Sequence, residues 1–170
     1  SYTGIDWDVD GTMTRLIGAH RGREAIVVAI SNTPLRSNEY WPAKAIPADV
    51  ITPEQRAQLL SDGYLHFIVE ELKPAIDATY RTKPSREDTL VMGSSLGGLI
   101  SAYAMAEYPE VFGAAGGLST HWPANDGAFI DYLAAHLPAR RTHRFYFDHG
   151  TATLDAQYAP YQQRMDAVLR

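Results

Sequence analysis

Residues 89–98 (TLVMGSSLGG) constrain the fold of this chain more than any other stretch. A short apolar run breaks at residues 93–97 (GSSLG) and continues as a helix-compatible segment over residues 99–108. Gly-x-Ser-x-Gly between a strand and a helix is typical of a nucleophile elbow, a tight turn that exposes a serine. The spacing places Ser95 at the tip of that turn. We expect Gly93 and Gly97 to supply the room that the turn needs.

The helix expected after this turn begins beneath the serine, which has a chemical consequence. The first amides of a helix lack partners within the helix, and the helix dipole is positive at that end. An oxygen that becomes negative during acyl transfer is stabilised by such amides. We therefore interpret Ser95 as a candidate nucleophile. The alternative is a glycine-rich turn without chemistry.

Bulk properties limit the other possibilities. The 170 residues suffice for one domain with a core, and 15 basic against 20 acidic residues give a formal net charge of −5. That balance, without a basic cluster, argues against a nucleic-acid partner. The absence of cysteine excludes disulfides, thiolate metal sites and cysteine nucleophiles. No apolar run reaches membrane-spanning length, and no signal-peptide pattern is visible, which favours a cytoplasmic location. We expect no metal or cofactor.

Strand and helix patterns alternate along the chain, which predicts a parallel α/β sheet with its loops meeting at one edge. We expect a single domain over residues 1–170, with three α/β/α layers and about four strands. The predicted strands are 24–30, 89–92, 111–119 and 144–148. The first is the richest in β-branched residues, as in a strand buried on both faces. The principal predicted helices are 9–17, 62–80 (bent at Pro74), 99–108, 126–136 and 158–169.

Several segments, in order along nearly the whole chain, resemble the Putative esterase family of α/β-hydrolases, which includes feruloyl esterase domains, enterobactin-esterase-like proteins and S-formylglutathione hydrolase. The segments are 7–10 (WDVD), 25–32, 36–42, 71–74 (ELKP), 93–98 (GSSLGG), 119–123 (STHWP) and 147–155. The resemblance implies an α/β-hydrolase core and a serine esterase working through an acyl-enzyme. It implies Ser95 as nucleophile and the Leu96 backbone N–H as an oxyanion donor. It also implies Asp155, or alternatively Asp148, as the acid.

Two departures from the family pattern bear on the general base. The family begins with earlier strands, one of which supplies a second oxyanion donor, and its catalytic histidine lies in a loop beyond a further strand. We therefore expect this chain to be an α/β-hydrolase truncated at both ends. His121 and His149 follow strands on the same edge as Ser95 and are the candidate substitutes for the base. Alternatively, His121 lines the pocket and His149 holds a turn.

The remaining expectations concern the pocket and the partners. Trp122 and Trp41 are candidates for the pocket wall, with core packing as the alternative. We expect a small-molecule ester substrate. Sheet edges left without neighbours expose apolar strands, so we expect a homo-oligomer formed through those edges. The alternative functions are a non-catalytic module for binding or assembly, and an acyltransferase whose acceptor is not water.

Overall fold

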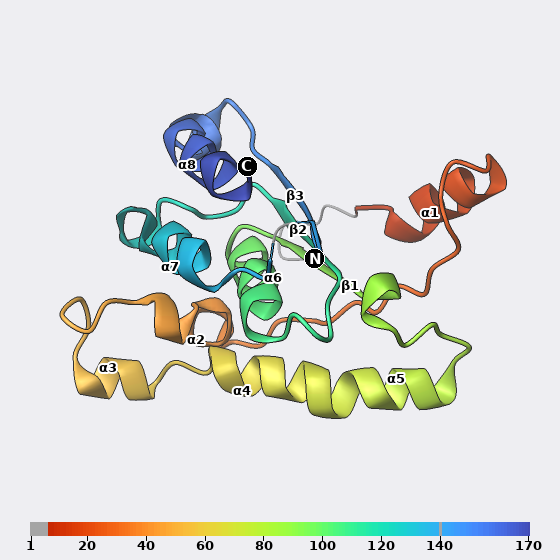
Figure 1. The fold of residues 1–170 in the computed structure, drawn as a ribbon, viewed down its shortest axis with the longest axis horizontal. Helices are drawn as coiled ribbons and strands as arrows, with labels where there is room; N and C mark the ends of the chain where they lie inside the picture. Colours follow the sequence, from red (N-terminus) through yellow and green to blue (C-terminus); the bar gives the residue numbers. More distant parts are fainter. Residues whose placement is uncertain (1–6, 140) are drawn as a thin grey trace. The chain divides into compact units, whose positions relative to one another are not determined.

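A computed structural model describes residues 7–139 and 141–170, which fall into two compact units. The smaller unit ends at Asn32, and its described residues contain the helix α1 (Val9–Gly18), which confirms the helix predicted over residues 9–17. The larger unit runs from Thr33 to Arg170 and contains the sheet and the predicted site. Figure 1 shows the elements of each unit along the chain.

The strand predicted over residues 24–30 is not formed. These residues carry no regular secondary structure, and the side chains of Val27 and Val28 are 56% and 41% exposed. A strand is held by hydrogen bonds to a neighbouring strand, and among the described residues none forms a ladder with this segment. A high content of β-branched residues therefore did not suffice, and the sheet has three strands where about four were expected.

The sheet consists of parallel strands in the order β1-β2-β3. The strands are β1 (Leu90–Ser94), β2 (Ala114–Leu118) and β3 (Arg144–Asp148). Their last residues, Ser94, Leu118 and Asp148, are in register. All three chains therefore leave the sheet at the same edge, and the predicted parallel α/β fold class is confirmed.

Seven helices surround this sheet in the larger unit as it is described. They are α2 (Arg36–Tyr40), α3 (Pro53–Ala57), α4 (Ser61–His66), α5 (Lys73–Thr79), α6 (Leu96–Glu107), α7 (Ala128–His136) and α8 (Ala159–Leu169). A π-helical turn (Phe67–Leu72) joins α4 to α5, so residues 61–79 form one helical run, as predicted. The widened turn lies just before Pro74, whose ring and missing N–H disturb a regular α-helix.

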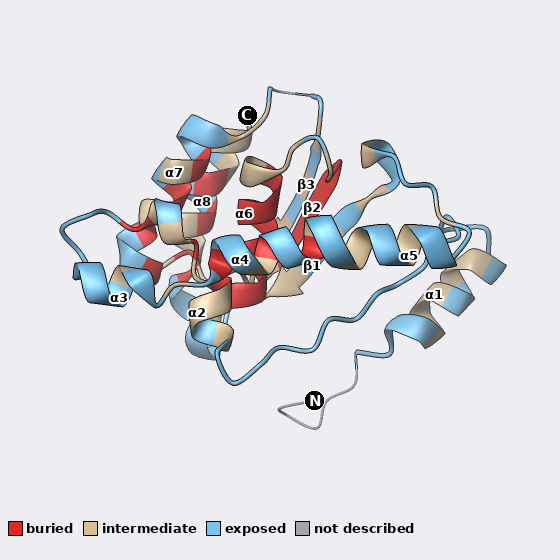
Figure 2. Ribbon diagram, turned by 90° about the horizontal axis from the view of Figure 1, so that it is seen from below, coloured by how far each residue is buried: buried red, intermediate tan, exposed pale blue. Residues whose placement is uncertain are grey.

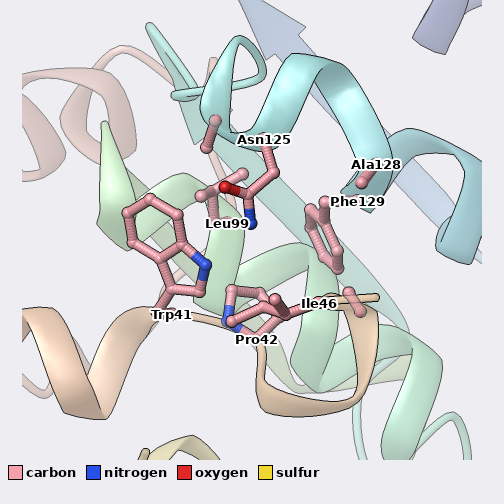
Figure 3. Close-up of a pocket in the computed structure, with 9 residues that line it drawn as sticks. Trp41, Pro42, Ile46, Leu99, Asn125, Ala128 and Phe129 are labelled. Carbon is pink, nitrogen blue, oxygen red and sulfur yellow. The ribbon is translucent and has the colours of Figure 1, made fainter. Parts of the chain in front are cut away.

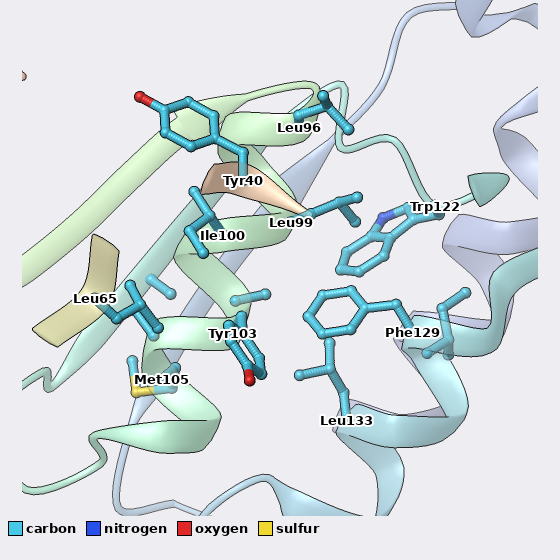
Figure 4. Close-up of a cluster of buried hydrophobic side chains, with 14 of the residues drawn as sticks. Tyr40, Leu65, Leu96, Leu99, Ile100, Tyr103, Met105, Trp122, Phe129 and Leu133 are labelled. Carbon is cyan, nitrogen blue, oxygen red and sulfur yellow. The ribbon is translucent and has the colours of Figure 1, made fainter. Parts of the chain in front are cut away.

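Helix α6 is the centre of the core. Residues 96–105 are all buried, and the helix contacts β1 and β2 on one side (Figure 2). On the other sides, Leu99 and Tyr103 pack with Leu65 of α4 and with Phe129 of α7 (Figure 4). The helix that follows Ser95 is therefore fixed on several sides, which keeps the turn at its start in place.

The two faces of the sheet differ in burial. Side chains alternate between the faces of a strand, and Val91 and Gly93 lie on the face that packs against α6. On the opposite face, Leu90, Met92 and Tyr146 are 59%, 54% and 60% exposed. Because β1 and β3 are the outer strands of the described sheet, their edges are the places where the expected self-association would occur; that expectation stays a prediction.

Candidate active site

The turn at Ser95 has the backbone of a strained elbow. Ser95 has φ 58° and ψ −120°, a conformation that non-glycine residues rarely adopt and that costs on the order of 1–3 kcal/mol. Backbone hydrogen bonds to β2 and within α6 hold it. The Ser95 N–H donates to the Leu118 carbonyl at 3.0 Å, and the Ser95 carbonyl accepts from the N–H groups of Gly98 (3.0 Å) and Leu99 (3.3 Å). The end of β2 and the start of α6 thus fix the turn together.

Only part of the expected role of the glycines is correct. A Cβ at Gly93 would lie 2.7 Å from the backbone carbon and oxygen of Gly97, so a side chain cannot be accommodated at Gly93 without movement of the helix. A Cβ at Gly97 would meet nothing within 4 Å, so the room expected there is not needed. The second constrained position is Gly98, where a Cβ would lie 2.4 Å from the hydroxyl of Thr120.

The Ser95 side chain is available for reaction. The residue is half-buried, and its hydroxyl has no hydrogen-bond partner among the described residues. The adjacent Leu96 N–H opens α6, a twelve-residue helix, where amides have no acceptor within the helix. The Ser95 hydroxyl and the Leu96 N–H are thus presented by adjacent residues; the oxyanion role that the resemblance implies for Leu96 stays a prediction.

Of the two candidate bases, His121 is tied more directly to the elbow. Its backbone N–H donates to the Ser95 carbonyl at 3.3 Å, and its ring Nδ1 lies 2.7 Å from the hydroxyl of Tyr158. The ring is half-buried, and burial lowers the pKa of His121 below its usual 6.5. The imidazole is therefore neutral at neutral pH, the form that can accept a proton.

His149 is held by its own turn. Its Nδ1 lies 2.7 Å from the carbonyl oxygen of Gly150. Because a carbonyl only accepts, Nδ1 carries the proton and Nε2 is left as the acceptor in the neutral ring. No contact joins this ring to Ser95 within the described residues.

The two candidate acids differ in how their oxygens are occupied. In Asp155, Oδ2 accepts from the Ser119 hydroxyl at 2.5 Å and from the Gly150 N–H at 2.8 Å. In Asp148, Oδ1 accepts from the Ser119 N–H at 3.2 Å and Oδ2 accepts from the Tyr146 hydroxyl at 3.0 Å. Asp155 therefore keeps one oxygen that no described residue occupies, whereas both oxygens of Asp148 are bound.

The charge of Asp155 is stabilised in place. The Ser119 hydrogen bond, then the Gly150 N–H, and then the positive form of His149 lower the pKa of the Asp155 carboxyl below its ordinary range. Ser119 was not identified as a site residue from the sequence. The available signal was its position directly after β2, at the edge where the strands end.

A shallow hollow lies beside α6 (Figure 3). Its lining comes from the loop after α2, from α6, and from the turn before α7 and its first residues: Trp41, Pro42, Ala45, Ile46, Leu99, Ala124, Asn125, Ala128 and Phe129. Leu99 lies one helical turn beyond Ser95, whereas Ser95, Leu96 and His121 do not line the hollow. The turn at its rim is left-handed: Asn125, Asp126 and Gly127 all have positive φ, which these residue types tolerate.

The two candidate wall residues have different positions. Trp41 lines the hollow. Trp122 is fully buried: its ring stacks on Phe129 at 6.0 Å, meets the Phe147 ring edge-on at 5.1 Å, and donates its indole N–H to Gln162 at 2.9 Å. Trp122 therefore packs in the core, which was the alternative reading for it, and does not line the hollow.

One arginine holds the loop that carries Trp41. The Arg56 guanidinium of α3 donates to the carbonyl oxygens of Ala43 (3.0 Å), Ile46 (2.9 Å) and Pro47 (3.1 Å). The helix that bears it begins with a capping box, in which Thr52 and Gln55 bond each other's backbone. The capped helix thereby anchors the proline-rich segment that forms one wall of the hollow.

The described residues contain no group of three or more histidine or acidic side chains placed to hold a metal ion. No helix in the described ranges combines the length and the apolar character needed to cross a membrane.

The chain resembles two solved structures of an esterase. It superposes on the enterobactin esterase FES of Shigella flexneri, solved in the presence of 2,3-dihydroxy-N-benzoyl-glycine, with a TM-score of 0.59 and 23% identity, over 81% of this chain and 33% of that one. For the same enzyme solved with enterobactin, the TM-score is 0.55 and the identity 26%, over 70% of this chain and 32% of that one. The chain thus spans about a third of the length of these enzymes.

Comparison of sequences agrees with this structural similarity. The Uncharacterized protein YbbA of Bacillus subtilis (strain 168) is 35% identical over 63 residues, which are 36% of this chain and 25% of that protein. The profile of the family described as Putative esterase matches residues 2–164. Since that match runs over nearly the whole chain, the protein belongs to the Putative esterase family.

Proposed function

We propose that this protein hydrolyses carboxylic esters with Ser95 as the nucleophile. The observation that carries the proposal is the half-buried hydroxyl of Ser95, which has no partner among the described residues and sits on a strained turn at the start of α6. Membership of an esterase family gives this turn a chemical context. Strain of this kind persists where the surrounding structure over-determines it, and it clusters at active sites.

The reaction follows from the atoms at the elbow. The Ser95 oxygen attacks the ester carbonyl carbon and gives its proton to a base, while the carbonyl oxygen becomes negative and accepts from the Leu96 N–H. The C–O bond to the leaving group breaks, the protonated base returns the proton to the departing alcohol, and an acyl-serine remains. Water then attacks the acyl carbon and releases the carboxylic acid.

His121 is the base that the geometry supports best. Its backbone is bonded to that of Ser95, its pKa is lowered by burial, and Tyr158 lies within hydrogen-bonding distance of Nδ1. If Nδ1 donates to the Tyr158 oxygen, the lone pair at Nε2 is free to accept the serine proton. Asp155 supplies a fixed negative charge on the same edge, and the imidazole that this charge interacts with is that of His149.

The substrate class is a small ester with an apolar part placed against Trp41. The lining of the hollow is mostly apolar, with the amide of Asn125 as its polar member. The similar enzyme FES was solved with enterobactin and with a benzoyl-glycine derivative. Esters with an aromatic acyl group are therefore suitable natural-type substrates to test beside simple chromogenic esters.

The decisive experiment is turnover of p-nitrophenyl acetate by the wild type and by Ser95→Ala. We expect the substitution to lower kcat/KM by roughly a thousandfold or more, since an acyl-enzyme cannot form without the nucleophile. Ser94→Ala is the matched control and should leave the rate near the wild-type value. Equal background rates for the wild type and Ser95→Ala would refute the proposal.

A second measurement separates reaction from turnover. A fluorophosphonate probe should label the wild type and not Ser95→Ala. Labelling of a wild type that does not turn over esters would favour a reactive serine without an efficient base, because no imidazole contacts the Ser95 hydroxyl in the described part of the chain. Absence of labelling would favour the non-catalytic alternative.

The base is tested by comparing His121→Gln with His149→Gln. We expect His121→Gln to lower kcat by on the order of 100-fold or more and His149→Gln to have a small effect. The acidic limb of the wild-type rate profile should have its midpoint below pH 6.5, since burial lowers the His121 pKa. Wild-type activity in His121→Gln would assign the base to another histidine.

A further inference from the structure

Ser119 resembles Ser95 in its backbone and stands at the same edge of the sheet. It follows the last residue of β2 and has φ 46°, which is unusual for a residue other than glycine. Its N–H donates to the Asp148 carbonyl at 3.0 Å, and the Asp148 carboxylate accepts from the same N–H at 3.2 Å. The end of β3 therefore holds the strained residue in place.

The consequence of this backbone is the direction of the Ser119 hydroxyl. The Ser119 oxygen lies 2.5 Å from Oδ2 of Asp155, across the sheet edge and 36 positions away in sequence. The Gly150 N–H donates to the same oxygen at 2.8 Å. Two donors from two different loops thus fix one oxygen of the carboxylate, and Oδ1 accepts no hydrogen bond from any described residue.

We propose that Ser119 is a positioning residue for the acid of this site. Its hydroxyl fixes the Asp155 carboxylate by one oxygen, so that the other oxygen is left free to accept a hydrogen bond at this edge. The proposal rests on the proposed esterase function for its catalytic meaning, whereas the hydrogen bond itself can be tested without activity.

Other groups near Asp155 must be considered in any titration. His149 interacts with the Asp155 charge from the loop after β3. Tyr158 lies one turn beyond Asp155, feels its charge, and contacts His121. Ser119 carries no charge. Its replacement therefore removes the hydrogen bond to Asp155 without changing the number of charges.

The test uses two variants that differ in backbone strain. Ser119→Ala and Ser119→Gly both remove the hydroxyl, but glycine tolerates a positive φ and alanine does not. The carboxyl resonance of Asp155, labelled with carbon-13 and assigned with Asp155→Asn, reports its pKa directly. We expect the titration midpoint to move upward in both variants, because the largest stabiliser of the charged form is lost.

Activity gives the second readout. We expect kcat for p-nitrophenyl acetate to fall by about tenfold in both variants, with KM nearly unchanged, whereas their resistance to urea differs. A merely structural role predicts the opposite, with Ser119→Gly as active as the wild type. Unchanged Asp155 titration in both variants would overturn the proposal. A moved titration in a protein without esterase activity would retain the positioning and reject the proposed function.

Discussion

Residues 24–30 and residues 90–94 are both short apolar runs that predict strands, and only the second forms one. The first run, EAIVVAI, has more β-branched residues than the second, LVMGS. The second pairs with β2 along its whole length and packs against α6, whereas the side chains of Val27 and Val28 are largely exposed. Local composition therefore decides less than the presence of a paired neighbour and a covering helix.

Strand pairing also bears on the residues that follow β1 and β2. Ser95 and Ser119 adopt positive φ at the ends of the paired strands β1 and β2, where hydrogen bonds from neighbouring strands hold them. A paired strand fixes its last residue accurately enough to impose a costly conformation on the next one. An unpaired segment has no such means of fixing its end.

Residues 24–30 and the paired strands should differ most in how the free energy of unfolding responds to a polar substitution. Ala115→Asn places an amide at a position that is 2% exposed in β2, and we expect a loss of about 3–5 kcal/mol in the free energy of unfolding. Val28→Asn alters an exposed side chain and should change that free energy by no more than about 0.5 kcal/mol. Urea unfolding measures both. A similar cost at Val28 would show that residues 24–30 are packed in solution.

Two glycines of the elbow should respond differently to substitution by alanine. We expect Gly93→Ala to cost about 3 kcal/mol, because its Cβ would lie 2.7 Å from the backbone of Gly97. Gly97→Ala, in the first turn of α6, meets open space and should be neutral or stabilising by up to about 1 kcal/mol. Thermal unfolding of the two variants gives the comparison. Equal losses would mean that the turn is packed differently.

Removal of one buried hydroxyl, that of Thr120, should stabilise the protein. The Thr120 oxygen is fully buried between α6 and β2 and lacks a hydrogen-bond partner among the described residues. Thr120→Val keeps the shape and removes the unsatisfied group, so we expect a gain of about 1 kcal/mol. Thr120→Ser keeps the hydroxyl and loses the methyl group, so it should destabilise by about 1 kcal/mol. Loss of stability in Thr120→Val would reveal a partner for the hydroxyl.

The smallest expected effect concerns pH. The pKa of folded His121 lies below 6.5, so the unfolded chain binds more protons than the folded chain as the pH falls below 6.5. The contribution of His121 to stability is therefore complete above pH 6.5 and is lost as the pH falls through the folded pKa. Between pH 7.5 and pH 5, the free energy of unfolding measured with denaturant should decrease less steeply in His121→Gln than in the wild type. The same pH dependence of the free energy of unfolding in the variant would show that the His121 ring is solvated in the folded protein.

Sequence reasoning was most successful where local rules decide the outcome. The helical run over residues 61–79 and three of the expected strands follow from local composition and spacing. It failed at residues 24–30 because pairing depends on distant parts of the chain. It assigned room to Gly97 because a motif does not specify which side of a turn is crowded; that is set by Thr120, which approaches Gly98.

The candidate site could likewise be predicted only where local rules decide the outcome. The position of Ser95 and the Leu96 amide follow from a continuous motif. The contacts of His121 with Tyr158 and of Ser119 with Asp155 join residues 37 and 36 positions apart, and no local pattern encodes them. Trp41 and Trp122 have the same chemistry, but one lines a hollow and the other is enclosed by Phe129 and Phe147.

The attachment of the Trp41 loop to Arg56 limits what evolution or engineering can change there. A planar guanidinium reaches three carbonyl oxygens at once, and an ammonium group on a flexible stem does not reproduce that fork. A lysine at this position would preserve the charge and yet release the segment that forms one wall of the hollow. If the hollow receives the acyl group, as proposed, selectivity would then change through a residue that does not line it.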